Sequence, residues 1–405
     1  MAPLSFYAYR ALSRLVFGLA SPLLPLPEPG LRAQKRGRLT GLPSGGLWVH
    51  AVSVGEVKSA AALGEELRTR RPALEQVVST VTATGGQMCA SLMPWAHHCY
   101  APWDSPGATT RALDALSPRA YVVCETELWP NMLHACVKAK VPAFLVNGRV
   151  SDHSFERYSK MSALAGFCLN SFEKVFARGE ADVNRFLALG LKSEKLVLCG
   201  EGKVDTLRAR MGEGPEGFAG DRPTFLAGST HEGEEQAVKE AWAAVRDAGF
   251  NPRLIIAPRH PERVEEVKAL FAGEKICTYS APSDDWDVMI VDQIGPLFRL
   301  YGGCTGAFVG GSLVKKGCQN LYEPALWGVP FAFGPSYEDF REPGDALIAT
   351  GLARVVAHGP DLAAFWLALA SGTLDLTRAR EDARRWIEGL PTPSRLWADV
   401  LCEYC

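Results

Sequence analysis

The sequence has almost no excess of charge of either sign. Its 405 residues include 43 lysines and arginines against 45 aspartates and glutamates, which gives a net charge of −2. A chain balanced in this way produces no overall field that attracts nucleic acid, so we expect no nucleic-acid partner and only local sites for anions. Internal repeats, heptad arrays and low-complexity tracts are also absent. What remains is a globular chain whose apolar residues, 47% of the total, can fill two cores.

Sequence motifs for binding a metal are also missing beside the candidate loops. No Asp-x-Asp, His-Glu-x-x-His or paired-cysteine motif lies beside the loops described below, so a mechanism without metal or cofactor is the natural expectation. The 11 cysteines are odd in number and mostly embedded in apolar runs, a pattern typical of a reducing compartment. The close pair Cys402 and Cys405 has no second pair or histidine cluster beside it. We interpret it as part of a frayed tail rather than as a metal or redox site.

The N-terminal segment, residues 5–20, is apolar but too short for a confident membrane span. Arg10 and Arg14 stand one helical turn apart, so apolar side chains can occupy the opposite face while the arginines meet lipid phosphates. Prolines between residues 22 and 29 end the helix, and basic residues between 32 and 38 add a cluster that an anionic leaflet attracts. We therefore predict a helix at a membrane surface. A terminal helix packed on the protein and a cleaved signal peptide are the alternatives.

Short apolar runs alternate with helix-like stretches along the rest of the chain. This alternation is typical of parallel sheets with helical connections, and the length exceeds that of one compact domain. A polar, glycine-rich interval at residues 211–221 predicts a linker. We expect a membrane-associating helix over residues 1–30 and two α/β domains over residues 31–210 and 222–405, the last thirty residues being mainly helical. The runs predicted as strands span residues 47–52, 76–81, 120–124, 143–146, 174–177 and 196–199, then 224–227, 254–257, 288–291, 307–309 and 329–333.

Residues that directly follow these runs are the candidates for chemistry, because ligands bind beyond the carboxyl ends of parallel strands. We expect the two domains to face each other across a cleft. Glu56 follows the first run, three residues after Ser53, which is the spacing of a capping box. Glu56 therefore either satisfies the start of a helix or accepts a proton from an acceptor hydroxyl in the cleft.

Further polar groups follow later runs of the first domain. Glu125 and Glu127 stand close to Trp129. Glu127 fits the first turn of the helix expected near Trp129, where the helix dipole favours negative charge, so Glu125 is the stronger functional candidate. After the last run, two glycines precede Lys203, whose charge suits a phosphate, although a solvated lysine is the default interpretation.

The second domain offers three comparable loops. Residues 229–235 repeat the capping spacing, and Arg259 can form a two-pronged contact with a phosphate or carboxylate, or else a surface salt bridge. Residues 308–314 form a glycine turn that leads to a helix start, an arrangement that binds anions. Asn320 and Glu323 fit a capping pair, and Glu323 can equally accept ribose hydroxyls of a nucleotide.

Taken together and in this order, the motifs resemble the 3-deoxy-D-manno-octulosonic acid (Kdo) transferase family of lipopolysaccharide synthesis. The resemblance implies an α/β GT-B glycosyltransferase with two Rossmann-like domains, whose parallel sheets face an interdomain cleft. It implies that the first domain binds the acceptor, a lipid A precursor (lipid IVA), and that the second binds the donor, CMP-Kdo. The implied location is the cytoplasmic face of the inner membrane. The matching segments are residues 50–56, 100–104, 125–131, 147–158, 200–205, 229–235, 258–263, 308–314 and 320–324.

The resemblance also assigns roles to residues. Glu56 corresponds to the general base of an inverting transfer, and Glu125 and Lys203 correspond to residues that support the transition state. Lys203, Arg259 and helix N-termini can stabilise the leaving nucleoside monophosphate without a metal. The positions that correspond to CMP binding are Pro258, Arg259, Ile294, Gly295, Pro296, Asn320, Leu321, Tyr322 and Glu323.

Two departures from the family pattern concern the donor site. Residues 294–296 read Ile-Gly-Pro where the family has Met-Gly-Glu, and residues 318–320 read Cys-Gln-Asn where it has Gly-His-Asn. Pro296 therefore removes a carboxylate that contacts the nucleotide, while Gly295 and Gln319 can still form hydrogen bonds. One alternative is thus a GT-B transferase for another nucleotide sugar or acceptor. The other is a non-catalytic membrane-bound paralogue, against which the joint retention of the catalytic and nucleotide-binding candidates argues.

Overall fold

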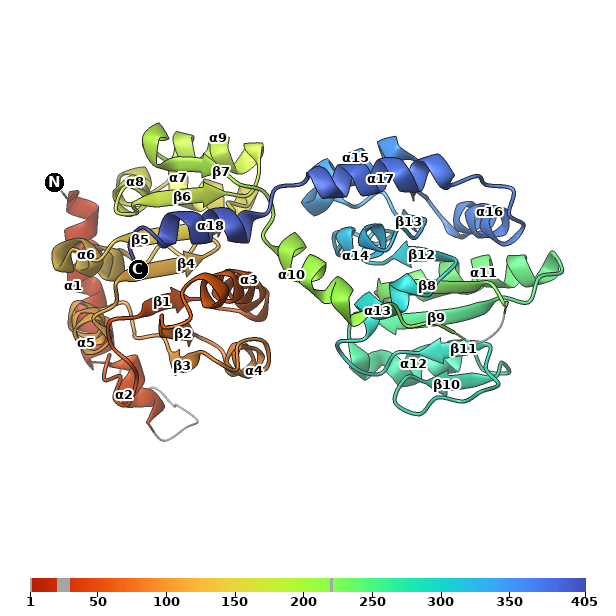
Figure 1. Ribbon diagram of the computed structural model, residues 1–405, viewed down its shortest axis with the longest axis horizontal. Helices are drawn as coiled ribbons and strands as arrows, with labels where there is room; N and C mark the ends of the chain where they lie inside the picture. The colour runs from red at the N-terminus through yellow and green to blue at the C-terminus, as the bar shows by residue number, and fades with distance from the viewer. Residues whose placement is uncertain (1, 20–29, 219–220) are drawn as a thin grey trace. The chain divides into compact units, whose positions relative to one another are not determined.

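A computed structural model describes residues 2–19, 30–218 and 221–405. The chain divides into two compact units, Met1–Thr206 with Pro391–Cys405 and Leu207–Leu390. Each unit contains a parallel sheet with helices on both faces (Figure 1). The prolines predicted to end the first helix, at residues 22–29, lie outside the described residues.

The first unit is built on a sheet whose described part has seven parallel strands. Its strand order is β3 (His97–Tyr100), β2 (Gln76–Thr80), β1 (Leu47–His50), β4 (Ala120–Cys124), β5 (Ala143–Gly148), β6 (Lys174–Ala177) and β7 (Leu196–Leu198). Leu47 lies opposite Gln76 on one side and Ala120 on the other, which sets the register at the centre. The helices are α1 (Leu4–Leu19), α2 (Leu31–Lys35), α3 (Val54–Arg70), α4 (Ala83–Leu92), α5 (Pro106–Leu116), α6 (Pro130–Ala139), α7 (Asp152–Ser159), α8 (Ser162–Leu169), α9 (Glu180–Ala188), the 3-10 helix η1 (Ser193–Lys195) and α18 (Pro393–Leu401), while α10 (Lys203–Arg210) runs into the second unit.

Alternate residues of each central strand enter two separate cores. In β4, Tyr121 and Val123 pack with side chains of α5, α6 and α8, whereas Val122 and Cys124 pack with side chains of α3 and α18. Every residue of β4 is buried. A strand covered on both faces needs apolar side chains on both, which is why the sequence shows a continuous apolar run rather than an alternating pattern.

The second unit repeats this architecture. Its strand order is β10 (Ile276–Thr278), β11 (Val288–Ile290), β9 (Arg253–Pro258), β8 (Thr224–Thr230), β12 (Gly306–Val309), β13 (Phe331–Phe333) and β14 (Ala353–Val355), all parallel. In β12, Ala307 and Val309 enter one core and Phe308 enters the other. The helices are α11 (Glu234–Asp247), α12 (Val264–Leu270), α13 (Leu297–Gly302), α14 (Tyr322–Leu326), α15 (Arg341–Thr350), α16 (Gly359–Ala370) and α17 (Thr377–Gly389), with the 3-10 helices η2 (Met211–Glu213), η3 (Pro261–Arg263) and η4 (Glu338–Phe340).

The two parallel sheets predicted from the apolar runs are confirmed, but three strands were not predicted. These strands, β3, β10 and β14, all lie at the edge of a sheet. Their side chains are only partly buried, and β3 contains two consecutive histidines. Polar or charged side chains interrupt the apolar pattern in these three strands, whereas the edge strand β7 keeps an apolar run and was predicted.

The predicted boundaries need two corrections. Residues 391–405 belong to the first unit, because Trp397 of α18 is fully buried in the core beside α3. Residues 211–218 are not a free linker: the backbone N–H of Glu216 donates to the carbonyl oxygen of Arg299 at 3.0 Å, and Phe218 packs edge-on against Trp286. Glycine-rich composition predicted a linker, but these contacts hold the segment on the second unit.

Helix α1 is packed against α5, α6 and α8 of the first unit. Phe6 is fully buried, and the Tyr9 hydroxyl donates to Asp104 Oδ2 at 2.9 Å. Ser13 accepts a hydrogen bond of 2.9 Å from the side-chain amide of Asn131. The opposite face stays in solvent, with Leu4, Leu12 and Leu15 more than half exposed. None of the helices in the described ranges combines the length and apolarity needed to span a bilayer.

Candidate functional site

The carboxyl ends of β1 and β4 mark the point in the first sheet where the strand order reverses. From β1 the chain builds outward through β2 to β3, and from β4 it builds the other way to β7. The loops that leave this point diverge, and open α/β sheets bind ligands there. Glu56 follows β1, and Glu125 and Glu127 follow β4, so the fold brings the predicted carboxylates to one place.

Glu56 is buried in the first turn of α3. Its Oε2 accepts the backbone N–H of Val52 at 2.7 Å, and its Oε1 accepts the Ser53 hydroxyl at 2.9 Å. Burial raises the pKa of Glu56 to about 7; the hydrogen bonds oppose the rise, and the charges of Glu125 and Glu127 add to it. A carboxyl with a pKa close to neutral can take up a proton and release it again under ordinary conditions. Glu56 therefore accepts hydrogen bonds at the start of α3, and its raised pKa makes it chemically able to exchange a proton near neutral pH.

The loop after β4 is held in an unusual conformation. Glu125 has a φ of 58°, in the left-handed region that side chains other than glycine rarely adopt, and its backbone N–H donates to the carbonyl oxygen of Val146 at 2.9 Å. Glu127 accepts the indole N–H of Trp129 at 3.0 Å, and burial raises its pKa. The Trp129 ring meets His50 edge-on, with ring centroids 5.5 Å apart. Backbone strain of this kind concentrates at functional sites.

Two residues at the same edge were not among the assigned site residues. Asn147 ends β5 with a φ of 53°; its amide donates to Ser59 at 3.2 Å, and its Oδ1 accepts the backbone N–H of Gly202 at 3.1 Å. Arg178 directly follows β6 and pairs with Glu201 at 2.9 Å. Burial lowers the pKa of Arg178, but Glu201, Asp182 and Glu125 outweigh it. Its position directly after a strand was the signal in the sequence that could have identified it.

Lys203 is the first residue of α10. Its side chain lies outside the described residues, so its predicted contact with a phosphate stays a prediction. The backbone before it is closely packed, because a side chain on Gly202 would meet the ring of Trp397 at 2.3 Å.

A buried polar network lies behind the loop after β4. Asp104 accepts the backbone N–H groups of Asn131 and Met132 at 3.1 and 2.8 Å, as well as the Tyr9 hydroxyl. Burial raises the pKa of Asp104, and these donors oppose the rise. The network ties α1 to the N-terminus of α6, a few residues after Glu127. The same hydrogen bonds therefore hold α1 and the start of α6, which follows the loop of Glu125 and Glu127.

In the second unit, the strand order reverses between β8 and β12. The glycine turn after β12, which leads toward a helix start, was predicted to bind an anion. The structure corrects this prediction for the N–H groups of the turn. The buried Glu234 carboxylate accepts the backbone N–H groups of Gly311, Ser312 and Leu313 at 2.7, 3.0 and 2.9 Å. The protein's own carboxylate therefore occupies the donors of the turn. The predicted capping pair is displaced as well, because α11 begins at Glu234 and not near Glu232.

Cationic groups gather beside this turn. Arg259, directly after β9, is exposed, and among the described residues it forms no ion pair. The rings of His231 and His260 lie 5.9 Å apart, edge to face. Burial lowers the pKa of His231, and the nearby His260, Arg259 and Lys316 lower it further against the opposing charge of Glu234. His231 Nε2 is buried without a hydrogen-bond partner in the part of the chain that is described. This cluster suits a phosphate, and the two histidines and Lys316 were not predicted.

The other predicted nucleotide positions lie at the end of β9, in the loop before α13 and at the start of α14. Pro258 is the last residue of β9. Ile294 is 84% exposed, Gly295 has a φ of 124°, and Pro296 caps α13. The Asn320 amide donates to Glu323 at 3.4 Å and its Oδ1 accepts the backbone N–H of Tyr322 at 3.2 Å, but the predicted capping pair is displaced, because the residue that caps α14 is Leu321. Leu321 is fully buried and Tyr322 nearly so. Within the described ranges, no group of three histidine, cysteine or acidic side chains is placed to hold a metal.

Comparisons with known proteins show the family of this chain. The family model described as 3-deoxy-D-manno-octulosonic-acid transferase matches residues 27–206. A 3-deoxy-D-manno-octulosonic acid transferase of Haemophilus influenzae is 33% identical over 74% of this chain and 73% of its own length. The corresponding transferase of Bordetella pertussis is 30% identical over 88% of this chain and 87% of its own length. This chain belongs to the Kdo transferase family.

Solved structures of low sequence identity share the fold of this Kdo transferase family member. A UDP-GlcNAc 2-epimerase from Neisseria meningitidis superposes with a TM-score of 0.59 at 13% identity, over 88% of this chain and 98% of its own. The glycotransferase of kitacinnamycin gives 0.58 at 14% identity, over 89% and 99%. The architecture is therefore GT-B, with two Rossmann-like domains.

The raised pKa of Glu56 predicts a stability effect with a definite sign. Between pH 4.5, its ordinary pKa, and about 7, the folded state binds more protons than the unfolded state, so ionisation lowers stability as the pH rises through this window. Glu56→Gln does not ionise. From pH 5 to pH 8 we therefore expect the variant to gain up to about 3 kcal/mol relative to the parent.

Urea unfolding at several pH values measures this difference. Glu65→Gln, on the exposed side of the same helix, is the control and should follow the parent at every pH. Parallel stability curves for Glu56→Gln and the parent would show that the carboxyl is not perturbed.

Proposed function

We propose that this protein is an inverting glycosyltransferase that moves Kdo from CMP-Kdo onto a hydroxyl group of a lipid A precursor. The observation that carries the proposal is the buried Glu56, whose pKa lies near neutrality at the strand-order reversal of the first sheet. Membership of the Kdo transferase family supports the choice of sugar.

The proposed reaction is a single displacement. The Glu56 carboxylate takes the proton from a glucosamine hydroxyl of the acceptor as the oxygen attacks the anomeric carbon of Kdo. The bond from that carbon to the phosphate oxygen breaks on the opposite side, so the anomeric configuration inverts and CMP leaves. Glu125 and Lys203 are assigned to stabilising the transition state, and the strained backbone of Glu125 supports a positioned rather than a solvated group.

The second unit is assigned to the donor. Arg259 and Lys316 offer positive charge, and the His231 ring offers a nitrogen without a hydrogen-bond partner among the described residues, so the leaving monophosphate can be stabilised without a metal. We assign Pro258, Ile294–Pro296 and the segment from Asn320 to Glu323 to the nucleoside. Pro296 offers no carboxylate, so we expect Gly295 to contribute backbone groups instead.

The proposal also places the first unit at a membrane surface, on the cytoplasmic face of the inner membrane. The exposed leucines of α1 support membrane contact, since they form an apolar face on a helix whose other side is packed on the protein. Free thiols at all 11 cysteines suit the reducing side of that membrane.

The central test is transfer of radiolabelled Kdo, with CMP-Kdo generated in the reaction, onto a tetraacylated lipid A precursor. Glu56→Ala should lose at least about a hundredfold in rate, the scale of a general base. The parent rate should rise as the pH passes through about 7, because the base acts only when ionised. Absence of product with folded parent protein would favour another donor or a non-catalytic role, and full activity of Glu56→Ala would discard this base.

Nucleotide selectivity tests the donor assignment. We expect CMP, but not UDP, to bind in calorimetric titrations, and Arg259→Gln to weaken CMP binding by about 10- to 100-fold, as for a lost charge-assisted contact. Arg378→Gln, at a position 93% exposed on α17, is the control with equal charge change. Preferential binding of UDP would support a transferase for another nucleotide sugar, for which the substitutions at residues 294–296 give a reason.

Membrane contact by α1 is tested with Leu12→Ser combined with Leu15→Ser. Burying two leucine side chains in a bilayer is worth several kcal/mol, so partial insertion predicts about a tenfold loss of binding to lipid vesicles. Co-sedimentation measures it. Leu187→Ser combined with Leu198→Ser removes two other exposed leucines of the same unit and should leave binding unchanged. Equal binding by all three proteins would remove α1 from the membrane proposal.

A further inference from the structure

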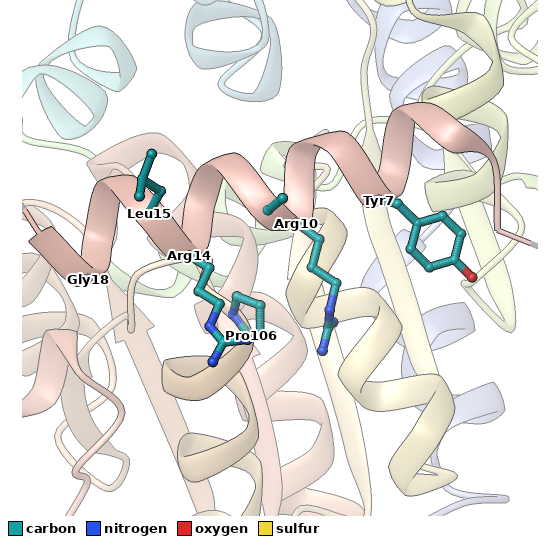
Figure 2. Close-up of a pocket in the computed structure, with 7 residues that line it drawn as sticks. Tyr7, Arg10, Arg14, Leu15, Gly18 and Pro106 are labelled. Carbon is teal, nitrogen blue, oxygen red and sulfur yellow. The ribbon is translucent and has the colours of Figure 1, made fainter.

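Two adjoining grooves run along α1, with volumes of about 530 and 260 Å³. Arg14, Gly18 and Pro106 line both of them, so the grooves meet at the C-terminal part of α1 and the start of α5. Figure 2 shows Arg10 and Arg14 extending from one side of α1, Arg14 beside Pro106, while Leu15 points away from them. We call the combined feature the Arg14 groove.

The Arg14 groove is strongly cationic. Arg10 lines the larger part, and Arg36 and Arg111 line the smaller part together with Arg14. No acidic side chain occurs among the described residues that line either part. Two nitrogens of Arg111 donate to the carbonyl oxygen of Arg36 at 2.9 and 2.7 Å, which fixes the direction of that guanidinium. Arginine side chains that line one groove offer several N–H donors and positive charge to the oxygens of a phosphate.

The surroundings of the groove are apolar. Phe17 and Trp103 stack with ring centroids 5.6 Å apart and form part of the wall of the smaller groove. Leu15 lines the larger groove and is 58% exposed. The ligand that fits both features carries a phosphate next to a hydrocarbon chain. The phosphate would contact the arginines, and the chain would contact the apolar side chains.

The groove is also held in shape without a ligand. Phe6, Tyr9 and Ser13 seat α1 on the first unit, the last two through the buried network of Asp104 and Asn131. A rigid helix presents its arginines at constant spacing, and binding then loses little conformational entropy in the protein.

We propose that the Arg14 groove binds the phosphate of an anionic phospholipid of the membrane, as a site distinct from that of the sugar acceptor. The lipid tails remain in the bilayer beside the exposed leucines of α1, and the headgroup enters between α1 and the start of α5. This inference rests on the proposed membrane contact of α1. It goes beyond the expected contact of Arg10 and Arg14 with lipid phosphates by assigning one headgroup to a defined groove that Arg36 and Arg111 also line.

The experiment compares full-length parent, Arg14→Gln and Arg38→Gln on vesicles of phosphatidylcholine alone and with one quarter phosphatidylglycerol. Arg38 is exposed and lines neither part of the groove, so it is a neighbouring control with equal charge change. On phosphatidylglycerol vesicles we expect Arg14→Gln to lose at least about tenfold in binding. Arg38→Gln should lose no more than about fivefold, the effect of one basic residue near an anionic surface. Binding to pure phosphatidylcholine should be the same for all three.

Equal losses in the two variants would overturn the proposal in favour of diffuse attraction, and an unchanged Arg14→Gln would overturn it outright. The lipid A acceptor is the other possible source of the bound phosphate. Kdo transfer in detergent micelles free of phospholipid distinguishes the acceptor from the membrane phospholipid. We expect Arg14→Gln to keep the parental KM for the acceptor there. A raised KM with unchanged vesicle binding would assign the groove to the acceptor's phosphate instead. Failure of the parent to bind either vesicle would remove membrane contact and the groove together, while leaving the transfer assay as an independent result.

Discussion

A parallel sheet with helices on both faces leaves only the ends of its strands for chemistry, and both sheets of this protein are of this kind. Their faces are filled by core side chains, and the strands of each sheet all run in one direction. Loops after the strands therefore collect at one edge, and those on either side of the order reversal diverge enough to admit a ligand. Glu56 and Glu125 in the first unit, and the loops that carry His231 and Gly311 in the second, owe their positions to this constraint.

Three buried carboxylates illustrate how the number of donors decides what a carboxyl group does. Glu234 accepts three backbone N–H groups of the glycine turn and a fourth from His231, so it serves as an internal anion that shapes the loop. Asp104 accepts two backbone N–H groups and the Tyr9 hydroxyl, and it ties α1 to α6. Glu56 accepts one backbone N–H group and one hydroxyl, and two carboxylates lie nearby. Glu56 thus has the fewest hydrogen-bond donors of the three carboxylates. Fewer donors leave the rise of its pKa to about 7 less opposed.

Helix α1 has one face packed on the first unit and another face exposed to solvent. One face is buried through Phe6 and hydrogen-bonded through Tyr9 and Ser13, which makes it part of the first unit. The other face is apolar and exposed, and arginines line the groove on its flank. Because the same network reaches the start of α6, α1 shares its hydrogen-bonded support with the end of the loop that carries Glu125 and Glu127.

The sequence by itself determined the two parallel sheets, because central strands buried on both faces have continuous apolar runs. It also identified the candidate loops, because polar residues such as Glu56 and Glu125 follow these runs directly. The edge strands β3, β10 and β14 were not predicted because polar or charged side chains interrupt their apolar pattern. Only the tertiary structure decided that α18 completes the first unit, that Glu234 fills the glycine turn, and that Arg178 and His231 join the candidate sites. Each of these depends on contacts between residues far apart in the chain, and neither local composition nor spacing records which distant partner a side chain will meet.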